Sequence, residues 1–184
     1  MNPLIQPPSH PFDIPPFEEI KADHFLPAFE RALTTQRKEY EAIESDPAQP
    51  TFENTIVALE RSGALLKLVS NVFYQRLGAH TEPALNRIAQ EISPILAAHE
   101  NRLLLSDSFF ERVDTIHRQD LSDFDEEERR MVIELHRRFT RAGVHLKGEE
   151  RRRLEEINLS LSSLSVRFQQ NLLDETNETY ILIE

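Results

Sequence analysis

The sequence lacks cysteine and tryptophan, and it has only four glycines among 184 residues. Without cysteine, disulfides, thiolate metal sites and a thiol nucleophile are excluded. Scarce glycine, together with few runs of strand-forming residues, favours helices over sheets. No apolar run approaches the roughly 20 residues of a membrane span. The absences together predict an all-α protein without a membrane partner.

Positive charge is also in the minority, with 21 basic against 32 acidic residues and a net charge of −11. Such a surface repels phosphate backbones, so nucleic-acid binding is not expected. The opening MNPLIQPPSH has neither the basic nor the apolar region of a secretory signal. The sequence therefore predicts a soluble, cytoplasmic protein.

Prolines are concentrated at the N-terminal end, where residues 1–22 hold six of the 11. Each proline fixes its own φ and favours an extended conformation in the residue before it. Residues 1–22 are therefore expected to form an extended arm, packed on the folded body through Ile14, Phe17 and Ile20.

Residues 23–178 carry apolar side chains at three- and four-residue steps, which predicts one helical domain. The expected helices run from Asp23 to the turn at 46–50, from Thr51 or Asn54 to Gly78, from 81–83 to about Leu103, from the cap Asp107 to about Ile116, from a capping box at 125–128 to Gly143, and from about Glu149 to Asp174. Gly63 falls on the apolar face of the second helix, where it either admits a close neighbour or weakens the helix.

The last helix carries a nearly heptad seam, which predicts an antiparallel hairpin with the helix before it. The seam consists of Leu154, Ile157, Leu161, Leu164, Phe168 and Leu172. The predicted fold class is thus a multi-helix bundle of antiparallel helical hairpins. Residues 179–184 resemble the start of a strand, and a single strand cannot satisfy its own backbone groups. We expect this strand to be truncated.

Histidine spacing gives no self-contained metal site. The seven histidines are His10, His24, His80, His99, His117, His136 and His145, and no two lie four residues apart. His99-Glu100 begins the zinc-binding pattern H-E-x-x-H, but Leu103 stands where the second histidine belongs. His99 is therefore expected to be a helix-surface or half-buried residue, and no metal-ligating residue is predicted.

Two other clusters have a structural interpretation beside a functional one. Ser160, Ser162, Ser163 and Ser165 lie within a helix without a G-x-S-x-G turn, so they are expected to pack beside the leucine seam. The basic segment Arg129–Arg153 could bind an anion such as a peptide carboxylate, but a solvated face paired with nearby acidic residues is the preferred interpretation. No catalytic or cofactor-binding residue is predicted.

Three stretches resemble the thimet oligopeptidase family of zinc metallopeptidases. They are NPLIQPPSHPFDIPPFEEIKADHFLPAFERAL, PTFENTIVALERSGALLKLVSNVFYQRLGAHT, and LHRRFTRAGVHL followed by INLSLSSLSVRFQQNLLDETN. The resemblance covers essentially the whole chain. It is nearest to the bacterial peptidyl-dipeptidase (dipeptidyl carboxypeptidase) branch, with oligopeptidase A second.

The resemblance implies a much longer, mostly helical enzyme in which two lobes enclose a channel for short peptides. It also implies one zinc ion in the C-terminal half, held by an H-E-x-x-H helix and a later glutamate, with the glutamate of the motif activating water. The present chain is then the N-terminal, channel-forming region, inactive alone, and its partners are the missing catalytic domain and short peptides. A non-enzymatic helical module that binds a protein or peptide is the alternative.

Overall fold

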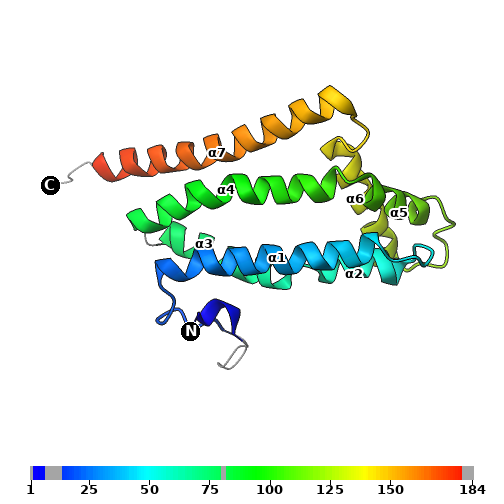
Figure 1. The fold of residues 1–184 in the computed structure, drawn as a ribbon, viewed down its shortest axis with the longest axis horizontal. Helices are drawn as coiled ribbons and strands as arrows, with labels where there is room; N and C mark the ends of the chain where they lie inside the picture. The colour runs from blue at the N-terminus through cyan, green and yellow to red at the C-terminus, as the bar shows by residue number, and fades with distance from the viewer. Residues whose placement is uncertain (1, 7–13, 80–81, 180–184) are drawn as a thin grey trace.

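The computed structural model describes residues 2–6, 14–79 and 82–179, and these residues form helices and connecting turns without a strand (Figure 1). The main helices are α1 (Phe25–Glu44), α2 (Ala58–Arg61), α3 (Ala64–Ala79), α4 (Pro83–Leu104), α5 (Asp107–His117), α6 (Glu126–Ala142) and α7 (Gly148–Glu178). Short 3-10 turns, η1 (Pro3–Ile5) and η3 (Ala22–His24), precede α1, and a π-helical segment, η4 (Phe52–Val57), leads into α2. The predicted all-α class is confirmed.

Local signals explain where several helices begin and end. Asp125 and Glu128 form the predicted capping box at the start of α6, each side chain accepting from the other's backbone N–H at 3.0 and 2.9 Å. Gly143 ends α6 in the left-handed region, with φ +91°. The cap of α5, however, is Ser106 rather than the predicted Asp107, because the Ser106 hydroxyl accepts from the N–H of Phe109.

The prediction of one continuous second helix is wrong, because the helix is interrupted at Gly63. Ser62 takes an extended conformation and Gly63 has φ +71°, so α2 and α3 are separate helices. An L-residue rarely adopts this φ, whereas glycine adopts it without steric cost. The helical pattern on both sides of Gly63 had concealed the break.

Two hydrophobic cores lie at opposite ends of α1. The first joins α1 to α3 and α4, with Phe25 and Phe29 packed edge-to-face on Phe73 at 5.0 and 5.4 Å. The second joins the C-terminal half of α1 to η4, α5 and α6 around Phe109 and Phe139. Figure 1 shows α1 and α4 running side by side, with α5 and α6 gathered at one end.

The N-terminal segment contacts the first core through Leu4 and Ile20, which are both buried there. Ile14 and Phe17, predicted as further anchors, are instead about half exposed. The predicted strand at 179–184 lies almost wholly outside the described residues. None of the described helices is long and apolar enough to cross a membrane.

The last helix does not form the predicted hairpin with α6. α7 packs along α4, whereas α6 packs against α5 (Figure 1). Polar side chains contribute to the contact between α7 and α4, where Asn158 donates to Asn101 at 2.7 Å and Gln90 donates to Gln170 at 2.6 Å, while Val166 of α7 packs against the first core. Most of the apolar seam is nevertheless exposed, and its exposed members are Ile157, Leu161, Leu164, Phe168 and Leu172.

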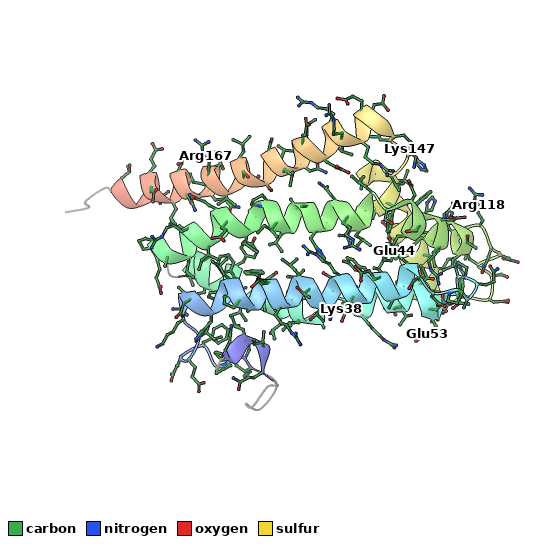
Figure 2. All side chains as sticks on the ribbon, viewed as in Figure 1. Lys38, Glu44, Glu53, Arg118, Lys147 and Arg167 are labelled. Carbon is green, nitrogen blue, oxygen red and sulfur yellow. The ribbon has the colours of Figure 1, made fainter. Side chains whose placement is uncertain are left out.

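Side chains fill the space between α1 and α4, whereas the outer side of α7, where Arg167 is labelled, has no helix opposite it (Figure 2). We call the exposed apolar residues of α7 the α7 seam. It is the largest set of exposed apolar side chains on any one helix of the described structure.

Candidate functional site

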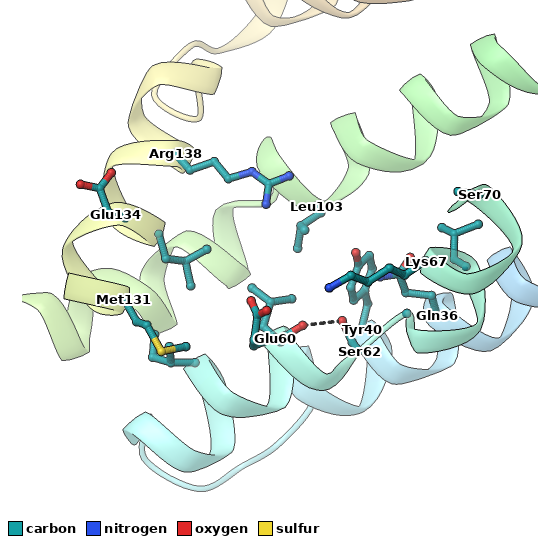
Figure 3. A pocket seen from close by; sticks show the side chains of 15 residues that line it. Gln36, Tyr40, Glu60, Ser62, Lys67, Ser70, Leu103, Met131, Glu134 and Arg138 are labelled. Carbon is teal, nitrogen blue, oxygen red and sulfur yellow. Dashed lines mark hydrogen bonds between the residues drawn. The ribbon is translucent and has the colours of Figure 1, made fainter. Parts of the chain in front are cut away.

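A groove of about 540 Å³ opens between α1, the η4–α2 segment, α3 and α6 (Figure 3). We call it the interhelical groove. Its apolar lining consists of Ile56, Leu59, Leu66, Leu103, Met131 and Leu135. Its polar lining consists of Gln36, Tyr40, Glu60, Ser62, Lys67, Ser70, Glu134 and Arg138. A concave surface of mixed apolar and charged character suits an extended ligand with both kinds of group.

Gly63 shapes the groove through its backbone. Its N–H donates to Glu39 Oε2 on α1 at 2.7 Å, which holds the break between α2 and α3 against α1. A Cβ at this position would lie 2.0 Å from Gln36 Nε2. Both interpretations of Gly63 are therefore observed, since the helix is interrupted there and α1 approaches closely.

A buried polar pair lies behind the groove, where Gln36 of α1 meets His99 of α4. Gln36 Oε1 and His99 Nε2 are 2.8 Å apart, and the His99 ring stacks on Tyr40 at 5.4 Å. Burial lowers the pKa of His99 below 6.5, and nearby Arg37 and Arg102 lower it further. His99 is therefore neutral at pH 7 and donates from Nε2. The prediction of a surface or half-buried His99 is wrong.

Tyr40 presents a neutral hydroxyl to the groove. Burial raises its pKa to about 12, while Arg138 and a hydrogen bond with Ser62 act in the opposite direction. The phenol therefore stays protonated near neutral pH. It is suited to hydrogen bonding rather than to general-base chemistry.

Charged side chains of both signs line the groove. Arg138 on α6 bridges to Glu100 on α4 at 2.9 Å, and Glu134 pairs with Arg137 at 2.6 Å. Lys67 on α3 makes no ion pair within the described structure, and Figure 3 shows it beside Tyr40 and Gln36. Lys67 and Arg138 together offer positive charge to a carboxylate, while the leucines offer apolar contact.

The basic segment Arg129–Arg153 is mostly paired with acidic residues. Arg151 and Lys147 both pair with Asp107, and Arg152 and Arg153 pair with glutamates one turn away on α7. Together, Lys147 and Arg151 hold the pKa of Asp107 at about 2. These contacts favour the solvated, charge-paired interpretation over an anion-binding stripe, and Arg138, paired with Glu100, fits it too.

The serine cluster satisfies its hydroxyls locally. Ser162 and Ser163 both donate to the carbonyl of Leu159, at 2.9 and 3.2 Å. Ser93 of α4 donates to the Ser162 carbonyl at 3.1 Å, which ties α4 to α7. Ser162 and Ser163 are thus partly buried and hydrogen-bonded within α7, as expected, whereas Ser160 and Ser165 are exposed.

Among the histidines, His10 and His80 lie outside the described residues. Linear spacing suggested that the others are too scattered to meet, but His117 of α5 and His136 of α6 stack with ring centroids 3.9 Å apart. Burial lowers the pKa of His117, and the neighbouring His136 lowers it further. No signal within either helix alone could have indicated this pairing, because 19 residues separate the two positions.

A buried arginine was also missed. Arg112 of α5 donates to the Asp46 carbonyl at 2.9 Å and to Thr55 Oγ1 and Asn54 Oδ1, both at 3.3 Å. It thereby joins α5 to the turn after α1 and to η4. A charged residue on an apolar helix face gave a weak hint that this position needed partners.

No family model matches the chain. Curated relatives do match it. The chain is 40% identical over 173 residues to the dipeptidyl carboxypeptidase of Salmonella typhimurium, covering 94% of this chain and 25% of the relative. The corresponding Escherichia coli protein is 36% identical over 174 residues, and Escherichia coli oligopeptidase A is 25% identical over 181 residues. The chain spans about a quarter of the length of these relatives.

Proposed function

This chain belongs to the thimet oligopeptidase family, and on that premise we propose that it is the N-terminal helical, channel-forming region of a zinc-dependent oligopeptidase or peptidyl-dipeptidase. The observation that carries the proposal is the 40% identity over 94% of the chain to a dipeptidyl carboxypeptidase about four times as long. The whole protein would hydrolyse short peptides, and the present chain would be inactive alone.

The described residues do not fit a catalytic zinc site of the H-E-x-x-H kind. His99 and Glu100 lie next to each other on α4, but Leu103 occupies the second histidine position. His99 is also buried and engaged with Gln36. We therefore assign the zinc and the catalytic base to the part of the protein outside this chain.

The interhelical groove supports a role in binding peptide. An extended peptide could direct a carboxylate to Lys67 and Arg138 while its apolar side chains contact Leu59, Leu66 and Leu103. The charged end of a peptide loses hydrating water when it enters the groove. A facing cation compensates for part of that loss and so favours binding. The groove would thereby help to form the channel wall.

The α7 seam supports a second contact, with the remainder of the same polypeptide. Phe168 is 68% exposed, and four further apolar side chains follow the same helical face. A contiguous exposed apolar surface of this kind marks an interaction site. The remaining three quarters of the protein is the proposed occupant, so residues 23–178 would be a domain that docks on a catalytic domain. We retain as part of this proposal the predicted arm at 1–22 and the predicted start of a strand at 179–184. A cytoplasmic location is also proposed, and cell fractionation would check it.

A kinetic experiment on the whole protein tests the groove. Lys67→Glu and Arg138→Glu should each raise KM for a short peptide by roughly tenfold, with kcat nearly unchanged, because they remove ground-state binding. Arg137→Glu is the matched control, since Arg137 lies on α6 beside Arg138 but does not line the groove. Unchanged KM in both groove variants would contradict the proposal.

The isolated chain provides a second test. It should not cleave short peptides with or without added zinc, and chelator-sensitive cleavage would overturn the assignment. The alternative, a non-enzymatic peptide-binding module, predicts tight binding of acidic peptides that is abolished by charge reversal at Arg137 and Arg141. The ion pairs of the basic segment make this alternative the weaker one.

A further inference from the structure

The junction of α5 and α6 holds a polar cluster that neither the interhelical groove nor the α7 seam uses. Asp114 and His117 lie three residues apart on α5 and so share one face of that helix. His136 reaches them from α6, with Nε2 3.2 Å from Asp114 Oδ1. One ligand atom from each of the three residues lies within 4.8 Å of the other two.

The three side chains combine partial burial with donor atoms that metals prefer. Their burial is intermediate, with the Asp114 and His136 side chains 17% and 22% exposed. Arg118 pairs with Asp114 Oδ2 at 2.7 Å, but its side chain is 77% exposed, and Figure 2 shows it at the solvent edge of α5. Asp114 Oδ1 therefore remains directed at the histidines.

We propose that Asp114, His117 and His136 form a binding site for a divalent transition-metal ion of the zinc type. Two imidazole nitrogens and one carboxylate oxygen are ligands that zinc accepts, whereas calcium and magnesium require mostly oxygen. Three protein ligands leave the fourth tetrahedral position to water. The site is independent of the catalytic zinc assigned to the rest of the protein.

The geometry requires a small adjustment. Zinc bonds of about 2.1 Å place tetrahedral ligand atoms roughly 3.4 Å apart. The His136–Asp114 pair is already near that separation at 3.2 Å. The two rings are nearly parallel, at 7°, and must tilt so that their lone pairs converge. Both side chains are only partly buried, which leaves their rotamers room for this tilt. Once bound, the ion would tie α5 to α6.

Zinc titration of the 184-residue chain by calorimetry tests the site, with helix content checked by circular dichroism. The wild type should bind one zinc ion, and His117→Gln and His136→Gln should each weaken binding at least about 100-fold. Even the loss of a group that only hydrogen-bonds to a metal ligand lowers metal affinity roughly 10- to 100-fold. His145→Gln is the matched control, because His145 is exposed and lies across Phe110 from His136 without joining the cluster. It should bind zinc as the wild type does.

Imidazole nitrogen NMR of the wild-type chain gives a readout that needs no variant to fold. Added zinc should shift the nitrogens of His117 and His136 and leave those of His24 and His99 in place. Zinc binding that is equal in the wild type and in both glutamine variants would overturn the proposal. So would saturation with zinc that leaves the His117 and His136 resonances unmoved.

Discussion

α1 and α7 are both long helices with apolar residues at three- and four-residue steps, yet they lie in opposite environments. On α1, Phe25 and Phe29 are fully buried against Phe73. On α7, Phe168 is 68% exposed, while polar side chains such as Asn158 and Gln170 contact α4. The difference shows that a periodic pattern specifies an apolar face but does not specify which surface covers it.

The strongest way to test this comparison is Phe29→Ala. The substitution leaves a cavity in the first core and removes the edge-to-face contact with Phe73 at 5.4 Å. It should lower the free energy of unfolding by about 3–5 kcal/mol. Urea denaturation followed by circular dichroism measures the loss. A loss below about 1 kcal/mol would mean that the α1 face is not the packed core described here.

Gly63→Ala tests whether α1 is equally constrained at Gln36, about two turns after Phe29 on the same face. The new Cβ meets Gln36, and φ +71° is strained for alanine, so the free energy of unfolding should fall by about 1–3 kcal/mol. Gly78→Ala is the matched control, since no atom lies within 4 Å of its added Cβ. At the C-terminal end of α3 this control should be neutral or slightly stabilising. Equal losses in both variants would contradict the close approach at Gly63.

The His99 pair on the inner side of α1 predicts a dependence of stability on pH. The folded-state pKa of His99 is below 6.5, so the unfolded chain takes up a proton first as the pH falls. The contribution of His99 to the free energy of unfolding is therefore complete above pH 6.5. It is lost as the pH falls through the lowered pKa of His99 in the folded state. His99→Gln should reduce the difference in unfolding free energy between about pH 7.5 and about pH 5.5. An identical difference in the variant would show that His99 does not titrate as described.

The smallest expected effect on the free energy of unfolding is that of a substitution on α7. Phe168→Ala is the same substitution as Phe29→Ala, but it removes an exposed ring, so the free energy of unfolding should change by no more than about 0.5 kcal/mol. It should instead reduce self-association of the isolated chain, which light scattering measures. A large loss of stability would place the α7 seam in a packed core after all.

Much of the local structure was predictable from the chain. The capping box at Asp125, the stop at Gly143 and the apolar stripe of α1 all depend on residues close in sequence. The break at Gly63 was not predictable, because the pattern on both sides continues in register. The prediction of an α6–α7 hairpin was wrong, because two amphipathic helices joined by a short loop can each pack against a different helix.

The candidate sites were less predictable than the fold. Gln36 is polar among the buried apolar residues of α1, and the structure shows that it is the partner of His99, 63 residues away. His117 and His136 looked unrelated, and the packing of α5 on α6 stacks them. Each of these pairs depends on contacts between helices, which spacing along one helix does not reveal.

By itself, the sequence determined that this chain is helical, where most of its helices begin and end, and that these 184 residues contain no H-E-x-x-H pattern. These features follow from propensity, capping and spacing, which act over a few residues. Only the tertiary structure decided that α7 packs on α4 with most of its apolar seam exposed, that Gly63 abuts Gln36, and that Asp114 lies beside two histidines. These outcomes depend on which distant surfaces complement each other, because burial is a property of the packed chain.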